Sequence, residues 1–176
     1  MTEDGVPGFA STDPPWVVIA RPGDPSVAAG LARFEEAGGV VRHLDGAVMR
    51  SEAELFAEFA RVLTFPGYFG RNWDAVVDCL GDLHGDWHGD ADVVVVVRSA
   101  DTVLSTPFAG VFASVLCQGA ERANASTDLD GLPLDDTPFA LHFVLEAGVL
   151  GPREIVEAVT WRDSVVTRRG DLVLVT

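Results

Sequence analysis

Three aspartates at helical spacing are the residues of this chain whose types and positions could do chemistry. Asp74, Asp78 and Asp82 follow one another at intervals of four, which places their carboxylates on one side of a helix. Like charges at this spacing repel by roughly 0.2–0.5 kcal/mol per pair. Such a stripe therefore belongs to a helix that faces either solvent or a cationic target.

The spacing alone leaves three interpretations of these aspartates open. Charged stripes are common on solvated helix faces, and Asp74 in the first turn would stabilise the helix dipole without any further role. Alternatively, a rigid acidic helix suits a basic site on another protein. Acid–base catalysis is the weakest alternative, because no histidine, serine or lysine stands beside Asp74 and Asp78 in the sequence.

The elements that must position the aspartates are a turn and a helix. Residues 65–70, rich in Pro, Gly and aromatic side chains, predict a turn, and residues 73–83 predict a helix capped by Asn72. Trp73, Val76, Val77 and Leu80 fall on the apolar side of that helix. Upstream, Ser51 and Glu54 form the pattern of a capping box, and Pro66 is expected to end the helix that they begin.

The remaining chain alternates between strand and helix patterns. Strands are predicted at 16–20, 40–43, 92–97, 139–146 and 172–175, with further helices from Pro25 to the Gly38-Gly39 pair, from Thr106-Pro107 onward, and at 152–161. This alternation predicts an α/β domain of two or three layers with a largely parallel sheet. His43 and His142 lie in predicted strands and are expected to be packed.

The segment resembles a known signature. Tyr68-Phe69-Gly70, then Asn72, then Asp74-Ala75, then Asp78-Cys79-Leu80 stand without a gap in the pattern of barstar-like proteins, the inhibitors of barnase-type ribonucleases. The order of surrounding elements is also similar. The resemblance implies a small parallel sheet packed by helices, here with N- and C-terminal extensions. We expect residues 39–146 to form the barstar-like domain, 1–38 a tail with a strand and a helix, and 147–176 a helix–strand extension on the same core.

The resemblance also implies a mode of action, in which the acidic helix covers a ribonuclease active site in place of substrate phosphates. By position, Asp78 matches the carboxylate that enters the phosphate site among arginines and a histidine, and Asp74 matches a contact one turn earlier. Tyr68 and Asn72 match residues that face the enzyme. Glu121 matches a further acidic contact if the long helix aligns without a gap, although a solvated glutamate beside Arg122 is an equal alternative.

Three positions depart from the pattern of the family: Val77, Arg71 and Leu83, the last of which replaces an aromatic residue. Barstar itself has a tryptophan where Val77 stands, and Arg71 replaces an acidic residue. The first change removes an aromatic contact surface, and the second weakens local attraction to a basic enzyme. We therefore expect the target to be a related or diverged toxin nuclease.

Composition limits the possible functions. The formal net charge is −15, from 27 acidic residues against 12 arginines and no lysine. The electrostatic field of this negative charge repels nucleic-acid phosphates and favours basic protein partners.

Cys79 and Cys117 are expected to be small buried thiols. The chain starts without the pattern of a signal peptide, and its longest aliphatic run is too short to span a membrane, so a cytoplasmic protein is expected.

No cofactor or metal is expected. His84 and His88 lie among aspartates but also among glycines, which favours a turn over a metal loop.

The sequence predicts a ribonuclease inhibitor, and not an enzyme. We expect it to bind a basic extracellular or toxin nuclease as an immunity protein. The alternative is a module of the same fold with a non-nuclease partner. An acidic hydrolase using Asp74 and Asp78 is the least favoured reading.

Overall fold

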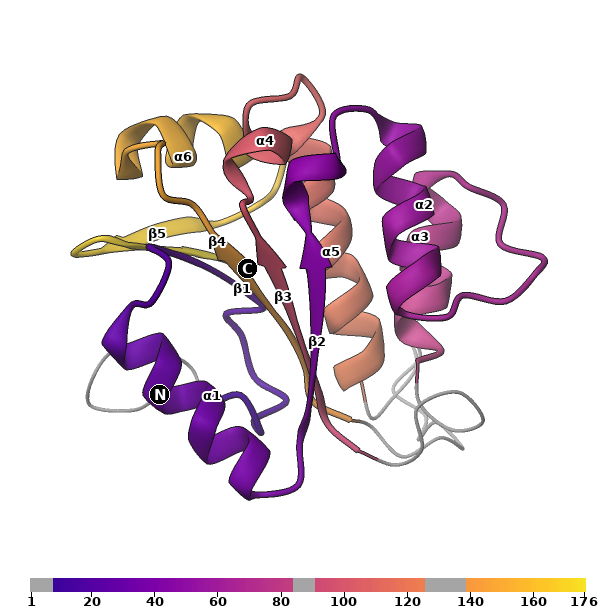
Figure 1. The fold of residues 1–176 in the computed structure, drawn as a ribbon, viewed down its shortest axis with the longest axis horizontal. Coiled ribbons are helices and arrows are strands. Elements are labelled where there is room, and N and C mark those ends of the chain that lie inside the picture. Colours follow the sequence, from indigo (N-terminus) through magenta and orange to yellow (C-terminus); the bar gives the residue numbers. More distant parts are fainter. Residues whose placement is uncertain (1–7, 84–90, 126–138) are drawn as a thin grey trace.

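The computed structural model describes residues 8–83, 91–125 and 139–176, which form a twisted sheet with helices on both faces (Figure 1). The strands are β1 (Val17–Ala20), β2 (Val40–Asp45), β3 (Val93–Arg98), β4 (Leu141–Glu146), β5 (Val166–Arg169) and β6 (Leu172–Val175). The helices are α1 (Pro25–Glu36), the 3-10 turn η1 (Gly46–Val48), α2 (Glu52–Val62), α3 (Trp73–Gly81), α4 (Asp101–Leu104), α5 (Ala109–Asn124) and α6 (Pro152–Val159).

The strand order in the sheet is β2-β3-β4-β1-β6-β5. Strands β2, β3, β4 and β1 run parallel to one another. Strand β6 runs antiparallel to β1, and β5 runs antiparallel to β6. The predicted α/β class with a largely parallel sheet is confirmed. Strand β5 was not predicted, because three of its four residues are exposed and it has no apolar alternation.

The helices form a layer on each face of the sheet. Helix α1 and Phe9 cover one face, through Val27 and Phe34. Helices α2, α3, α5 and α6 contribute to the larger core on the other face. Because both faces are covered, the five consecutive valines of β3 are all buried, which explains their continuous rather than alternating pattern.

Strand β1 lies inside the sheet, hydrogen-bonded to β4 on one side and to β6 on the other. All four of its residues are buried. The first and last strands of the chain therefore belong to the same sheet as the central segment.

Several boundaries differ from the prediction. Helix α2 ends at Val62, before Pro66, and Thr64 takes a left-handed backbone with φ of 54°. Helix α5 begins at Ala109 rather than at Thr106, whose hydroxyl donates to Val103 O at 2.6 Å in the turn after the unpredicted helix α4. Helix α3 ends at Gly81, two residues early.

The two histidines of the predicted strands have different environments. His43 is exposed on the edge strand β2, contrary to the expectation that it would be packed. His142 is fully buried, and its ring nitrogens lie 3.1 Å from Pro15 O and 2.6 Å from Ser11 O. Burial lowers the pKa of His142. These contacts tie the segment before β1 to the start of β4.

Candidate functional site

Helix α3 begins at a sharply defined cap. The Asn72 side chain accepts a hydrogen bond from the Ala75 N–H at 2.8 Å, as the sequence predicted. Immediately before it, Arg71 adopts a left-handed backbone with φ of 49°. This turn directs the chain from the aromatic loop into the helix. The amide of Asn72 thus has a structural role, while the residue itself remains exposed.

The three aspartates all lie on the exposed side of α3, opposite the buried Val76, Cys79 and Leu80. The Asp74 carboxylate has no hydrogen bond or ion pair with any other residue that the structure describes. Val77 is half-buried and packs against the main core, so only part of its surface is available to a partner.

Asp78 is paired within the chain. Arg122, near the end of α5, donates from Nη1 to Asp78 Oδ1 at 2.5 Å, and its Nη2 lies 4.0 Å from Asp82 Oδ1. The Asp78 and Arg122 side chains remain 62% and 52% exposed, so the pair is accessible to a partner. Because 44 residues separate the two positions, no local pattern in the sequence could have revealed the contact.

Close packing of α3 against α5 creates this pairing. A Cβ at Gly119 would lie 2.7 and 2.8 Å from Leu80 Cδ1 and Cβ, so only glycine permits the observed approach. A Cβ at Gly81 would lie 2.7–2.9 Å from the Cγ, Cδ and Nε of Arg122. The arginine stem therefore lies directly across the last turn of α3.

An aromatic cluster supports the loop in front of α3. The ring of Phe69 lies 5.0 Å from that of Phe65 and 6.2 Å from that of Phe56, with edge-to-face geometry. Trp73 packs on Phe56 at 4.9 Å and donates from Nε1 to Glu52 on α2 at 3.2 Å. These contacts anchor the loop to two helices.

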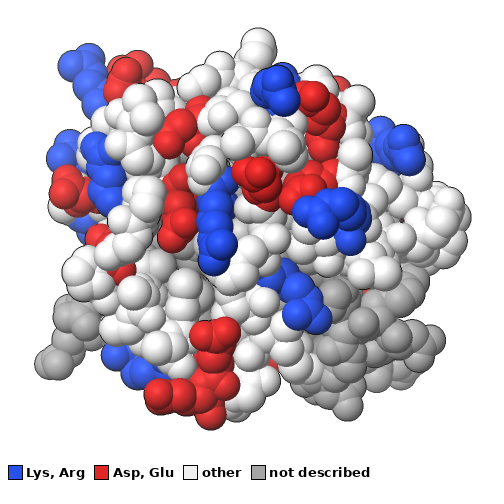
Figure 2. All heavy atoms as spheres, viewed as in Figure 1, with Lys and Arg blue, Asp and Glu red and all other residues white. Residues whose placement is uncertain are grey.

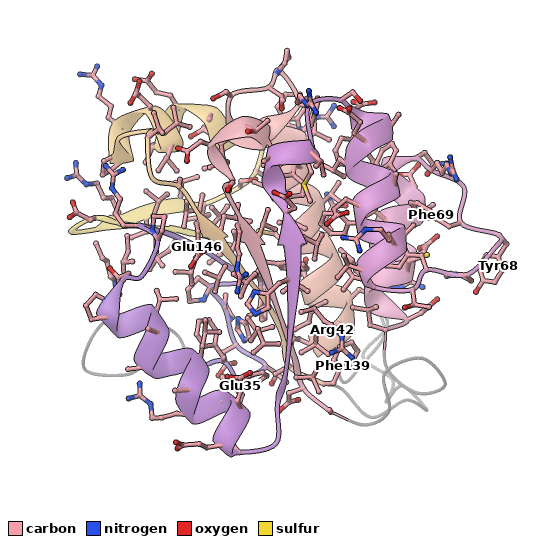
Figure 3. All side chains as sticks on the ribbon, in the orientation of Figure 1. Glu35, Arg42, Tyr68, Phe69, Phe139 and Glu146 are labelled. Atoms are coloured by element: carbon pink, nitrogen blue, oxygen red, sulfur yellow. The ribbon has the colours of Figure 1, made fainter. Side chains whose placement is uncertain are left out.

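Tyr68 lies at the tip of this loop and points away from the protein, whereas Phe69 next to it is half-buried (Figure 3). With 77% of its surface exposed, Tyr68 is one of the few large apolar side chains so displayed. The loop and α3 together present Tyr68, Asn72, Asp74, Val77 and Asp78 as one surface, which we call the α3 surface.

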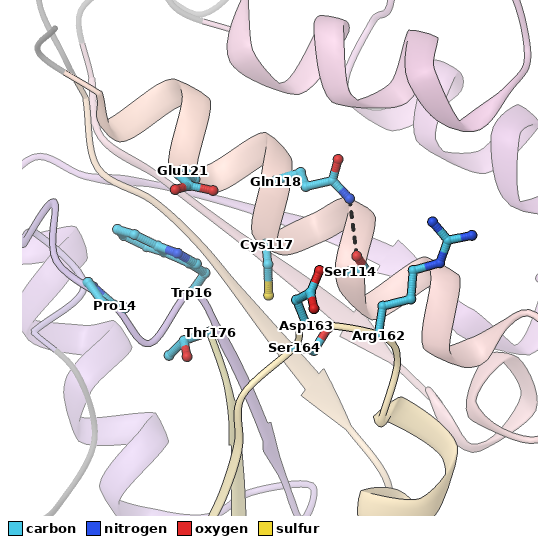
Figure 4. A pocket seen from close by; sticks show the side chains of 10 residues that line it. All are labelled: Pro14, Trp16, Ser114, Cys117, Gln118, Glu121, Arg162, Asp163, Ser164 and Thr176. Atoms are coloured by element: carbon cyan, nitrogen blue, oxygen red, sulfur yellow. Dashed lines mark hydrogen bonds between the residues drawn. The ribbon is translucent and has the colours of Figure 1, made fainter. Parts of the chain in front are cut away.

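Glu121 lies elsewhere. The neighbours of α3 on α5 are Gly119 and Arg122, whereas Glu121 lines an open hollow of about 740 Å³ beside Pro14 and Trp16 (Figure 4). Of the six sequence-predicted contact residues, five therefore lie on α3 or on the cap and loop before it, and Glu121 lies on α5 beside the hollow.

The surface charge is not uniform on the side of the molecule that carries α1. There, acidic and basic side chains are intermixed rather than gathered by sign (Figure 2). The net charge of −15 is therefore a property of the whole chain rather than of that face.

Other chemistries find little support in the described part of the chain. It contains no group of three His, Cys, Asp or Glu residues that could hold a metal ion. His84 and His88, which form the predicted histidine-rich turn, lie outside the described residues.

Cys79 and Cys117 are both buried free thiols, as predicted. Burial, together with the charge of Glu121, raises the pKa of Cys117 to about 12. No helix in the described residues is long and apolar enough to cross a membrane.

The fold and the α3 surface define an α/β protein that displays an acidic helix beside an aromatic loop. The family model described as Barstar (barnase inhibitor) matches residues 40–128, and the chain belongs to this family. The match runs from the start of β2 past the end of α5 and includes the whole α3 surface. No curated protein matches the chain. Members of the family are inhibitors rather than enzymes, and the family points to a ribonuclease partner.

Proposed function

We propose that this protein inhibits a basic ribonuclease by covering the active site of the enzyme with the α3 surface. The observation that carries the proposal is the exposed Asp74 carboxylate, which no described residue engages, on a helix held rigidly between α5 and the aromatic cluster. Carboxylates form bidentate, charge-assisted hydrogen bonds with arginine. A helix that presents them at fixed spacing can therefore replace substrate phosphates in a cationic site.

The rigidity of the surface supports this role. The α3 helix is capped by Asn72, packed on α5 at Gly119, and joined to α2 through Trp73. A surface that is already ordered loses little conformational entropy when it binds. The overall negative charge would further accelerate association with a basic enzyme, in a manner that weakens as salt rises. In the cytoplasm of a cell that makes a toxic nuclease, such binding gives immunity.

Titration calorimetry of the purified protein against barnase and a panel of barnase-type ribonucleases tests the proposal. We expect binding by at least one enzyme, together with loss of its RNA cleavage. Asp74→Asn should weaken that binding by about 2–5 kcal/mol, because the arginine of the nuclease would be left buried without its partner. The matched control is Glu36→Gln, which removes one negative charge from α1 on the opposite face of the sheet.

Two results would count against the proposal. Failure of every nuclease in the panel to bind would favour the alternative, a module of the same fold with a non-nuclease partner. Binding that survives Asp74→Asn as well as it survives Glu36→Gln would place the interface elsewhere. Glu121→Gln measures the extent of the footprint, because a nuclease that covers α3 reaches Glu121 only by extending around α5.

A further inference from the structure

Arg71 stands in the chain between two residues of the α3 surface, and its backbone conformation is one that arginine rarely adopts. Its φ of 49° lies in the left-handed region, where the Cβ of any residue other than glycine crowds the backbone. Glycine or asparagine would fit this position with less strain. The backbone alone therefore disfavours an arginine here.

The charge of Arg71 is also unfavourable for the fold. The residue directly precedes Asn72, the cap of α3, and so lies at the end of the helix where unsatisfied amide groups carry partial positive charge. Anionic side chains stabilise this end of a helix, and cationic ones do not. Asp74 in the first turn has the favourable sign, but no described ion pair joins it to Arg71.

No contact within the described part of the chain compensates for these two costs. The Arg71 side chain is exposed and makes no hydrogen bond, ion pair or ring contact with any described residue. Arg162 provides a comparison, because its backbone is also left-handed, with φ of 41°, but its guanidinium lies 5.5 Å from the ring centroid of Trp161. That contact offsets the strain at Arg162, and the described residues offer no equivalent to Arg71.

We propose that Arg71 is a contact residue of the α3 surface, and that its guanidinium pairs with a carboxylate of the nuclease beside the groups that receive Asp74 and Asp78. The inference rests on the proposed function, because it concerns which nuclease the same surface accepts. Tyr68 and Asn72, on either side of Arg71 in the chain, are both exposed, so a partner that covers them also reaches Arg71. A guanidinium donates two parallel hydrogen bonds to a carboxylate, which would fix the orientation of the partner and reject nucleases with a basic group at that place.

The test measures stability and binding in the same variants. Arg71→Gly relieves both the backbone strain and the charge at the helix end, so its Tm should rise by about 2–4 °C. Its affinity for the nuclease of the panel that binds wild type most tightly should fall by about tenfold, because charge-assisted hydrogen bonds are lost. Arg162→Gly is the matched control, since it removes an arginine of the same backbone conformation from the C-terminal extension, and it should change that affinity by less than about twofold.

Two further variants separate the charge of Arg71 from the flexibility of its turn. Arg71→Asn tolerates the left-handed backbone but removes the charge, and should lose as much affinity as Arg71→Gly. Arg71→Lys keeps the charge without the planar fork, and its affinity should lie between those of Arg71→Asn and wild type. A loss of affinity in Arg71→Gly alone would assign the effect to a loosened turn and would contradict the inference.

A double-mutant cycle identifies the group that Arg71 contacts. The acidic residues of the bound nuclease are replaced by their amides one at a time, and one replacement should weaken binding of wild type but not of Arg71→Asn. If no replacement shows this coupling, the partner group is not a carboxylate and the inference is wrong.

The remaining outcomes distinguish this inference from the proposed function. A lower Tm in Arg71→Gly would mean that the arginine stabilises the fold, and would overturn the inference without any nuclease. Unchanged affinity in Arg71→Asn would also overturn it, while the proposed function stands. If no nuclease of the panel binds wild type, the proposed function fails and the contact made by Arg71 fails with it.

Discussion

Substitution of Gly119 by alanine tests the helix contact that positions the α3 surface. The added Cβ would lie 2.8 Å from Leu80 Cβ, an atom fixed by the backbone of α3, and 2.7 Å from Leu80 Cδ1. Rotation of the leucine relieves only the second contact, so the two helices must separate. Overpacking of this kind destabilises by about 1–3 kcal/mol, whereas the gain in helix propensity from Gly to Ala returns about 1 kcal/mol.

The expected net result for Gly119→Ala is a loss of about 1 kcal/mol, with a fall in Tm of roughly 2–4 °C for a chain of this size. Urea denaturation and calorimetry measure it. Gly110→Ala in the same helix is the control, because its Cβ would meet Trp161, which is 37% exposed, at 3.1 Å and the turn holding Trp161 can move. We expect that variant to be neutral or slightly stabilised.

A Gly119→Ala protein at least as stable as Gly110→Ala would refute the reasoning, since it would mean that α3 and α5 are not held at the separation described. A destabilised variant that still binds its nuclease normally would refute a narrower point, namely that the α5 contact sets the position of the carboxylates.

Three further results follow from the contacts. In a double-mutant cycle of unfolding free energies, Asp78→Asn and Arg122→Gln should show a coupling of about 0.2–1 kcal/mol that declines in high salt, because the pair is exposed; a larger coupling would contradict that exposure. Burial lowers the pKa of His142, so below about pH 6.5 the unfolded chain takes up a proton that the folded ring resists. Thermal melts should therefore show stability falling as the pH drops from 7 towards 5, and His142→Gln should flatten part of that fall. Phe69→Ala should destabilise by roughly 1–3 kcal/mol, less than a fully buried phenylalanine, and should weaken nuclease binding by more than an equally destabilising change in α1.

The local features of the site could be predicted from the sequence because they depend on residues a few positions apart. The Asn72 cap, the apolar side with Val76 and Leu80, and the exposed aspartates all follow from helical geometry. The error at the start of α5 is also local, since Thr106-Pro107 is a common way to begin a helix but here closes the turn after α4.

The role of the chain ends in the sheet required tertiary structure. Strand β1 was predicted as a strand, but nothing in its four apolar residues specifies that it lies between β4 and β6. Strand pairing depends on long-range contacts, and β5 joins the sheet through hydrogen bonds with β6 rather than through a buried face of its own.

The sequence by itself determined the family, the α/β class and the acidic helix with its aromatic turn, because a contiguous motif and helical periodicity are local properties. Only the tertiary structure decided which charges on that helix are available. Packing at Gly119 and Gly81 brings Arg122 onto Asp78 and leaves Asp74 without a partner among the described residues, while the rotation of α5 directs Glu121 towards Trp16. Charges that lie far apart in the chain interact only when two helices are packed in a particular register, and that register is a property of the folded core.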